Sequence, residues 1–175
     1  MIKDFVSVII PCFGDYWFYL PTAIESLKDQ NDKRFEVIIQ HGNSVAEARN
    51  EGVKKSVGEY ILLLDADDKI HQDYIKRILE RKADILMIGY MEFGESIAIG
   101  KLSTEYTYER ALMEDLFIIS AAFKREFFED FKDIEREDRD FWARLLKKGA
   151  KVDKIDEILF FYGKHGKSRS SNLCV

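Results

Sequence analysis

The sequence predicts an α/β protein, a three-layer αβα sandwich in which helices cover both faces of a mostly parallel central sheet. Three observations lead to this prediction. Strand-like and helix-like segments alternate through residues 1–90, the strand-like segments are apolar almost throughout, and polar residues follow directly where these segments end. Strands that are buried on both faces are typical of parallel sheets covered by helices.

In the first half, strands are expected at 5–10, 35–39, 60–64 and 83–90, and helices at 21–30, 44–55 and 71–81. The first strand is rich in β-branched residues and stops at Pro11, a pattern that favours extended structure. Pro21 falls in the first turn of its helix, where a missing N–H is tolerated. Ser44 and Glu47 have the spacing of a capping box, which predicts that the second helix begins there.

The second half is less regular. Residues 92–101 fit either a hairpin or a loop, 117–123 a strand and 124–131 a short helix. Residues 138–148 predict a helix that ends at Gly149, a residue favoured just past a helix C-terminus. Two short strands are expected within 152–161, followed by a polar tail.

Length and composition limit the class of protein. The 175 residues suit a single domain, and 46% of them are hydrophobic, which excludes a disordered chain. No apolar run approaches the roughly 20 residues that span a bilayer, so we expect a protein of the cytoplasm or of a membrane surface. The net charge of −5 argues against a nucleic-acid partner. Cys12 and Cys174 lie at opposite ends of the chain, so we expect no disulfide and a buried Cys12.

Three loops should meet at one edge of the sheet, because ligands of parallel α/β sheets bind beyond the carboxyl ends of the strands. These loops are 11–16, 40–44 and 65–68. The last contains Asp65, Asp67 and Asp68, and neighbouring carboxylates raise one another's pKa unless a cation relieves the repulsion. Mg²⁺ takes one or two protein carboxylates and completes its shell with phosphate oxygens and water. The alternative is an acidic loop in which Asp67 or Asp68 caps the next helix.

An ordered set of motifs resembles the family 2 glycosyltransferases, which have the GT-A form of a Rossmann-like fold. The matching segments span nearly the whole chain and are 6–11, 48–52, 58–61, 65–68 and 137–149, followed by Tyr162, His165, Ser168 and Ser170. The resemblance implies a metal-dependent, inverting transfer of a sugar from a nucleoside-diphosphate sugar to an acceptor hydroxyl. It also implies a nucleotide-sugar-binding half at 1–90 and an acceptor and catalytic half at 91–175, with a basic C-terminal tail.

The resemblance also assigns roles on the donor side. Asp65 and Asp67 would be the Asp-x-Asp pair that binds Mn²⁺ or Mg²⁺, with Asp67 the more direct ligand and Asp65 nearer the ribose or the metal. Pro11 and Cys12 would lend backbone contacts to the nucleotide. Arg49 would approach the donor nucleotide, and its alternative role is a surface ion pair.

On the acceptor side the resemblance makes Asp138 the general base, since a carboxylate can deprotonate a hydroxyl held within hydrogen-bond reach. The alternative for Glu137 and Asp138 is favourable charge at a helix N-terminus. His165 would approach the metal or the diphosphate, beside the basic residues of the tail; its alternative is simple exposure. The aromatic run 16–19 either packs on the first helix, which we favour, or stacks on a base or a sugar.

Two features depart from the family pattern. In the family the second strand usually ends in a pair of aspartates, one of which reads the uracil base, whereas Gln40 and His41 stand here. Either side chain can still bond to a base, so His41 is a candidate donor contact and the base of the donor is open. Between this loop and Ala48 the family normally has another strand and helix, which predicts a shortened form of the fold.

Other function classes stay open at this point. A sugar-phosphate nucleotidyltransferase also uses a nucleotide-binding α/β sheet and a metal, but usually has a Gly-rich basic loop where 13–15 stand. A catalytically inactive nucleotide-sugar-binding module is supported only by the absent aspartates near His41. The acceptor can be a glycan, a lipid-linked or a protein hydroxyl, and the chain can be a homodimer.

Overall fold

The computed structural model describes residues 1–165. Cys174 and the tail residues Lys167, Ser168, Arg169 and Ser170 lie outside the described part of the chain. The strands are β1 (Ile2–Cys12), β2 (Phe35–His41), β3 (Gly58–Leu63), β4 (Lys69–Ile70), β5 (Ile85–Gly94), β6 (Ala98–Ile99), β7 (Ala122–Lys124) and β8 (Val152–Lys164). The helices are η1 (Gly14–Tyr19), α1 (Leu20–Lys28), α2 (Val45–Lys55), α3 (Tyr74–Arg81), α4 (Tyr108–Met113), η2 (Arg125–Phe127) and α5 (Glu137–Lys147), where η denotes a 3₁₀ helix.

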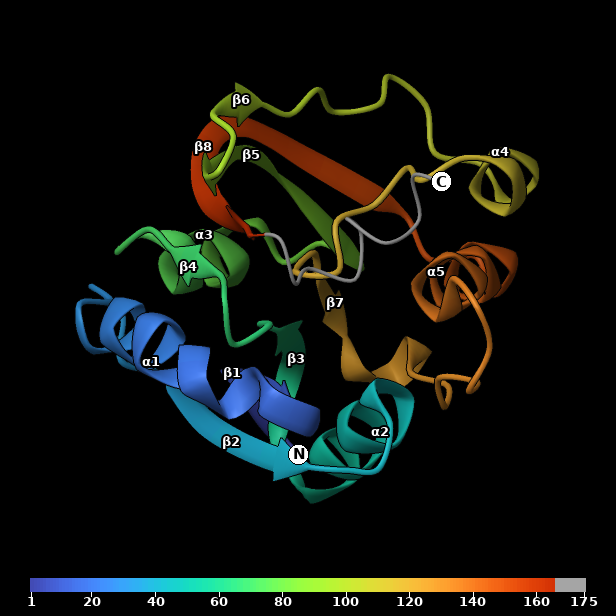
Figure 1. The fold of residues 1–175 in the computed structure, drawn as a ribbon. Coiled ribbons are helices and arrows are strands. Elements are labelled where there is room, and N and C mark those ends of the chain that lie inside the picture. Colours follow the sequence, from blue (N-terminus) through green and yellow to red (C-terminus); the bar gives the residue numbers. More distant parts are fainter. Residues whose placement is uncertain (166–175) are drawn as a thin grey trace.

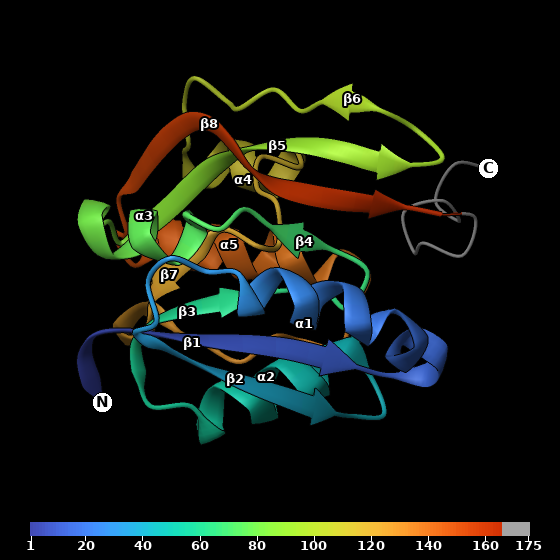
Figure 2. The same cartoon turned by 90° about the vertical axis from the view of Figure 1, so that its left-hand side faces the viewer.

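The described strands form one sheet in the order β2-β1-β3-β7-β5-β8-β4, with β6 paired to β5 (Figure 1). The pairs β1–β2, β1–β3 and β5–β8 are parallel, while the short β7 runs antiparallel between β3 and β5. The strands β1, β2, β3, β5 and β8 therefore point the same way (Figure 2). Their carboxyl ends lie at one side of the molecule, as the sequence predicts.

Helices cover both faces of this sheet. On one face Leu27 of α1 and Ile75 of α3 pack with even-numbered residues of β1 such as Val8. On the other face Val53 of α2 and Trp142 of α5 belong to a second core with odd-numbered residues such as Ile9. The predicted three-layer sandwich is confirmed.

Local sequence signals explain several element boundaries. The Ser44 hydroxyl accepts a hydrogen bond from the Glu47 backbone N–H at 3.2 Å, so the predicted cap of α2 is confirmed. The Glu47 carboxylate accepts from the Asn43 backbone N–H rather than from that of Ser44. Gly149 follows α5 with φ +94°, and its predicted role as the helix end is confirmed. Only residues 42–44 separate β2 from α2, which agrees with a shortened fold.

The second half differs from the sequence-based expectation. The strand expected at 117–123 is only β7, and the helix expected at 124–131 shrinks to the single turn η2. The two strands expected within 152–161 are one strand, β8, whose register on β5 shifts near Gly89. Pairing with β5 along its whole length explains why β8 stays continuous despite its mixed polarity. The sequence analysis also missed α4 and β4, while 92–101 proves to be the β5–β6 hairpin.

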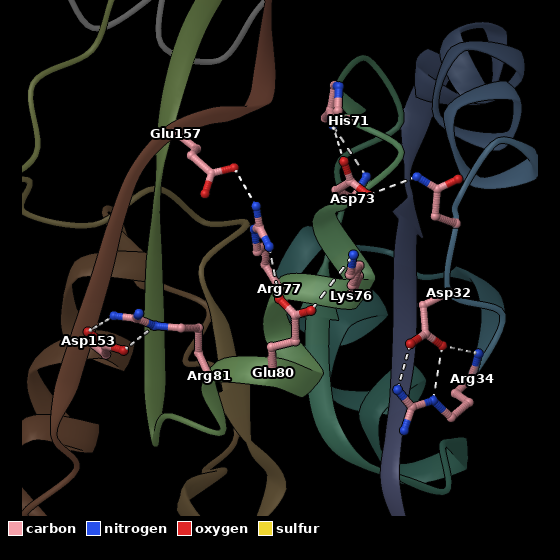
Figure 3. A network of polar contacts seen from close by, with 11 residues as sticks. Asp32, Arg34, His71, Asp73, Lys76, Arg77, Glu80, Arg81, Asp153 and Glu157 are labelled. Carbon is pink, nitrogen blue, oxygen red and sulfur yellow. Dashed lines mark hydrogen bonds and ion pairs between the residues drawn. The ribbon is translucent and has the colours of Figure 1, made fainter.

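Charged side chains fasten α3 to β8 on the outside of the sandwich (Figure 3). The Arg81 guanidinium donates to both carboxylate oxygens of Asp153, at 2.8 and 2.9 Å. Arg77 donates to Glu157 at 2.9 Å. These contacts hold the last strand beside the first half of the chain, and β8 carries His165 just beyond its end.

Candidate functional site

The predicted loops do meet at the carboxyl edge of the sheet. Cys12 and His41 are register partners at the ends of β1 and β2, and Asp65 follows β3 next to them. Pro11 and Cys12 are buried, so their backbone can face a ligand only from the loop side. Burial raises the pKa of the Cys12 thiol, as expected for a small core residue and not for a nucleophile. His41 is exposed at the strand end, whereas the Gln40 side chain is bonded to Lys55.

Arg49 is buried, so the expected alternative of a surface ion pair is wrong. Only 3% of the residue is exposed. Its guanidinium donates to Glu137 at 3.0 Å and to Asp65 at 3.1 Å, and it lies over the Phe131 ring. One helix of the first half thereby connects the aspartate loop to the N-terminus of α5. Contact between Arg49 and a donor stays a prediction.

The loop that carries the aspartates is held by β8. Asp68 is completely buried and accepts a hydrogen bond from the Gly163 backbone N–H at 2.8 Å. Burial, and then the charges of Asp65 and Asp67, raise the pKa of Asp68 well above its ordinary value. Asp68 is therefore an anchor of the loop, a role that its place in a run of carboxylates did not reveal. The alternative that Asp67 or Asp68 caps the next helix is wrong, because Asp73 precedes α3.

Asp67 and His165 meet although they are far apart in the sequence. The His165 Nε2 lies 2.8 Å from Asp67 Oδ2, and these side chains are 20% and 9% exposed. The Tyr19 ring stacks on the imidazole with centroids 4.4 Å apart, and Tyr16 lies at 6.3 Å. The alternative of a simply exposed His165 is wrong. The aromatic run does lead directly into α1, but two of its rings also frame this histidine.

These residues fit a divalent cation as part of a shared shell. Among residues 1–165 no three histidine, cysteine or acidic side chains gather closely enough to bind a metal by themselves. Asp67 and His165 nevertheless place an oxygen and a nitrogen donor side by side. Burial, followed by the charge of Asp65, raises the pKa of Asp67, and a cation would offset both effects. Two protein ligands leave room for the phosphate oxygens and water that complete a Mg²⁺ shell. Asp65 is ion-paired with Arg49, which leaves Asp67 as the better-placed carboxylate.

Asp138 stands in the first turn of α5 and faces a cavity of about 520 Å³. Its carboxylate accepts a hydrogen bond from the Arg139 backbone N–H at 2.9 Å. Burial and the neighbouring charge of Glu137 raise the pKa of Asp138, which makes the ionised carboxylate a stronger base than an exposed aspartate. Asp65 and Arg49 line the same cavity. The structure therefore brings Asp65, predicted to lie at the donor side, and Asp138, the predicted base, to one cavity.

Several lining residues were missed by the sequence analysis. They combine aromatic rings with carboxylates and are Tyr90, Glu92, Asp115 and Phe117 among others. Tyr162, a residue of the C-terminal motif, lines the cavity as well. Tyr90 could have been found, because it ends the fourth expected strand, whereas Glu92 begins the segment 92–101, for which a hairpin and a loop were both open. No sequence pattern indicated Asp115, since it lies in an irregular segment. Ion pairs with Arg136 and Arg139 hold it in place.

The family model described as glycosyl transferase family 2 matches residues 40–131, which is just over half of the chain. The chain belongs to glycosyl transferase family 2. The matched segment contains Arg49, the aspartate loop and Phe131, and it ends shortly before Asp138.

Relatives of this family member come from several bacteria and an archaeon. The chain is 29% identical to the putative teichuronic acid biosynthesis glycosyltransferase TuaG of Bacillus subtilis, and the match covers 97% of the chain and 83% of TuaG. It is 24% identical to the uncharacterized glycosyltransferase MJ1057 of Methanocaldococcus jannaschii, over 93% of the chain and 71% of that protein. The match to glycosyltransferase GlyA of Streptococcus pneumoniae, 27% identical, covers 55% of the chain but only 18% of GlyA.

The fold is shared with a solved structure from another protein. S. aureus TarS 1–349 in complex with UDP-GlcNAc superimposes with a TM-score of 0.78 at 17% identity. The match covers 98% of this chain and 62% of the TarS chain. The expected GT-A architecture is therefore confirmed. No helix within residues 1–165 has the length and apolar character needed to cross a membrane.

Proposed function

We propose that this family 2 member transfers a sugar from a nucleoside-diphosphate sugar to an acceptor hydroxyl, with inversion at the anomeric carbon. The observation that carries the proposal is the shared cavity, because Asp65 and Asp138 both line it. A base that shares one cavity with the donor suits direct displacement by an acceptor. The relatives named as glycosyltransferases and the UDP-GlcNAc complex of TarS support a nucleotide-sugar donor.

In this mechanism Asp138 takes the proton of the acceptor hydroxyl as that oxygen attacks the anomeric carbon. The ionised Asp138 competes for this proton more strongly because burial and Glu137 raise its pKa. Asp67 and His165 would hold Mn²⁺ or Mg²⁺, which would supply Lewis-acid stabilisation of the leaving diphosphate. Tyr19 keeps the His165 ring oriented by stacking on it. The aromatic and acidic lining of the cavity suits a sugar hydroxyl, whether on a glycan, a lipid-linked sugar or a protein.

The donor site is tested by thermal-shift measurements with UDP, GDP and dTDP and their sugars, with and without Mn²⁺. Ligands that bind the native state raise the melting temperature by mass action. We expect a Mn²⁺-dependent shift for one nucleotide that Asp67→Asn abolishes. The nucleotide that raises the melting temperature also identifies the base that the site accepts next to His41. An equal shift in Asp67→Asn would overturn the proposed metal site.

The transfer step is tested by Asp138→Asn, which removes the base but keeps the size of the side chain. We expect nucleotide binding to stay within about threefold while transfer falls by roughly 10²-fold or more, the usual contribution of general base catalysis. Release of nucleoside diphosphate from the donor measures the reaction. Full activity of Asp138→Asn would contradict the role, and release of pyrophosphate from a nucleoside triphosphate and a sugar phosphate would instead indicate a nucleotidyltransferase.

A further inference from the structure

Arg49 forms ion pairs with Asp65 and Glu137, both of which line the cavity. Its Nη2 donates to Asp65 at 3.1 Å and its Nη1 donates to Glu137 at 3.0 Å. Asp65 is two residues before the proposed metal ligand Asp67, and Glu137 immediately precedes the proposed base Asp138. The partners of Arg49 are 16 and 88 residues away in the chain. A single guanidinium thus joins the aspartate loop to the helix that carries the base.

The burial and shape of this group suit a rigid connection. The Arg49 side chain is 4% exposed and that of Glu137 is 6% exposed, so solvent does not loosen the pair. The guanidinium lies 5.4 Å from the centroid of the Phe131 ring, which restricts its movement. Asn50, the next residue of α2, exchanges hydrogen bonds with the Phe131 backbone at 2.7 and 2.9 Å. The planar fork of arginine can bond to two carboxylates at once, which the single ammonium of lysine does not reproduce.

We propose that Arg49 is a positioning residue that sets the distance between the donor side of the cavity and Asp138. This inference rests on the proposed function. This role differs from a contact with the donor, because Nη1 and Nη2 of Arg49 donate to the carboxylates of Glu137 and Asp65, which belong to the protein itself. The consequence is that loss of the fork should slow the transfer step more than it weakens binding, since a displacement of about 1 Å can reduce a rate by 10²-fold.

Charge provides a second effect of the same placement of Arg49 beside Asp138. The Asp138 carboxylate is surrounded by Glu137 on its own helix, Arg49 from α2 and Asp115 from the segment after α4. Burial and the two carboxylates raise the pKa of Asp138, while Arg49 lowers it. Removal of the Arg49 charge should therefore raise the pKa of Asp138 further. Arg49→Lys keeps the positive charge and loses only the planar guanidinium that bonds to two carboxylates at once.

Arg144 provides a matched control within the same fold. Its guanidinium also bonds to two carboxylates, Glu129 at 2.7 Å and Asp140 at 2.8 Å, and lies 5.9 Å from the centroid of the Phe141 ring. Arg144 does not line the cavity. Arg144→Lys and Arg144→Gln therefore reproduce the loss of a bridging arginine without affecting the site.

The experiment compares Arg49→Lys and Arg49→Gln with the two Arg144 variants in the full chain. Two quantities are measured: kcat and KM for release of nucleoside diphosphate, and the pKa of Asp138 from a carboxyl NMR titration. For Arg49→Lys we expect kcat to fall by about 10²-fold with KM within about threefold. For Arg49→Gln we expect the same fall and a higher pKa of Asp138, with both Arg144 variants close to the wild type.

The double variant Arg49→Met with Glu137→Met covers the case in which single variants do not fold. It replaces a buried ion pair by apolar side chains of similar size, a change that proteins often tolerate. A folded double variant with wild-type kcat would overturn the inference, as would an unchanged pKa of Asp138 in Arg49→Gln. The titration needs no turnover, so a wild-type chain without transferase activity would count against the proposed function while the Asp138 pKa still decides the role of Arg49.

Discussion

At the scale of single residues, Asp138 combines a proposed catalytic role with an unfavourable environment. Burial and the adjacent Glu137 raise its pKa, so the folded state binds a proton on this side chain more tightly than the unfolded state does. The charged form therefore destabilises the folded protein at every pH above the folded-state pKa. This penalty declines as the pH falls through that pKa and disappears below the unfolded value of about 3.9.

Asp138→Asn should consequently raise the free energy of unfolding at pH 7, because the substitution removes the cost of keeping this carboxylate charged in the folded state. The free energy of unfolding from urea titrations measures the effect, and the gain should vanish near pH 4. Asp140→Asn is the control, and for it we expect the opposite change in the free energy of unfolding. The pKa of Asp140 is lowered, because its bonds to Lys132 and Arg144 outweigh the effect of burial. Loss of this carboxylate should therefore lower the free energy of unfolding at pH 7. A destabilised Asp138→Asn at pH 7 would contradict this reasoning.

At the scale of elements, the contact between the aspartate loop and β8 positions the proposed metal ligands. A Cβ atom added at Gly163 would lie 2.2 Å from the Asp67 backbone oxygen. The Gly163 N–H also donates to Asp68. This strand must therefore carry glycine where it passes the loop, and the same strand leads to His165. The geometry of Asp67 and His165 thus depends on one close backbone approach.

Gly163→Ala should push β8 away from the loop, because backbone atoms cannot yield as a flexible side chain can. We expect Mn²⁺-dependent nucleotide binding to weaken by at least tenfold in calorimetric titrations, together with a lower melting temperature. Asp68→Asn serves as the companion variant, since its amide oxygen still accepts the Gly163 N–H. Its binding should stay within about threefold of the wild type. Intact binding in Gly163→Ala would show that the loop is held by other contacts.

At the scale of the whole molecule, the short β7 joins the two halves of the chain in one sheet. Phe123 of β7 pairs with Ile61 of β3 on one side and Ile85 of β5 on the other. Its side chain is fully buried, and its ring contacts Phe141 and Trp142 of α5. The strands at the donor side and the helix that carries Asp138 therefore share one core.

Phe123→Ala should destabilise the protein by about 3–5 kcal/mol, the usual cost of removing a buried aromatic ring. Because the core is shared, far-UV and near-UV circular dichroism should still show one coincident unfolding transition in urea. Phe128→Ala removes a partly buried ring nearby and should cost less. Two separated transitions in the Phe123 variant would indicate that the halves fold as independent units.

The sequence by itself determined the parts that depend on local physics. The apolar strands of residues 1–90, the cap at Ser44 and the helix end at Gly149 were predictable, because each depends on side chains within a few residues. The motifs placed Asp65, Asp67 and Asp138 at the ends of strands or the start of a helix. Their order along the chain was sufficient to predict the family and its fold.

Only the tertiary structure decided which of these residues meet. Asp67 reaches His165 because β8 runs parallel to β5 and returns beside the aspartate loop, a pairing that no short pattern specifies. Arg49 is shared between Asp65 and Glu137, and Asp68 is an anchor for Gly163, because burial selects partners across long stretches of chain. Hydrophobic periodicity reports which face of an element is buried, but not what lies against it, and the site is made from those contacts.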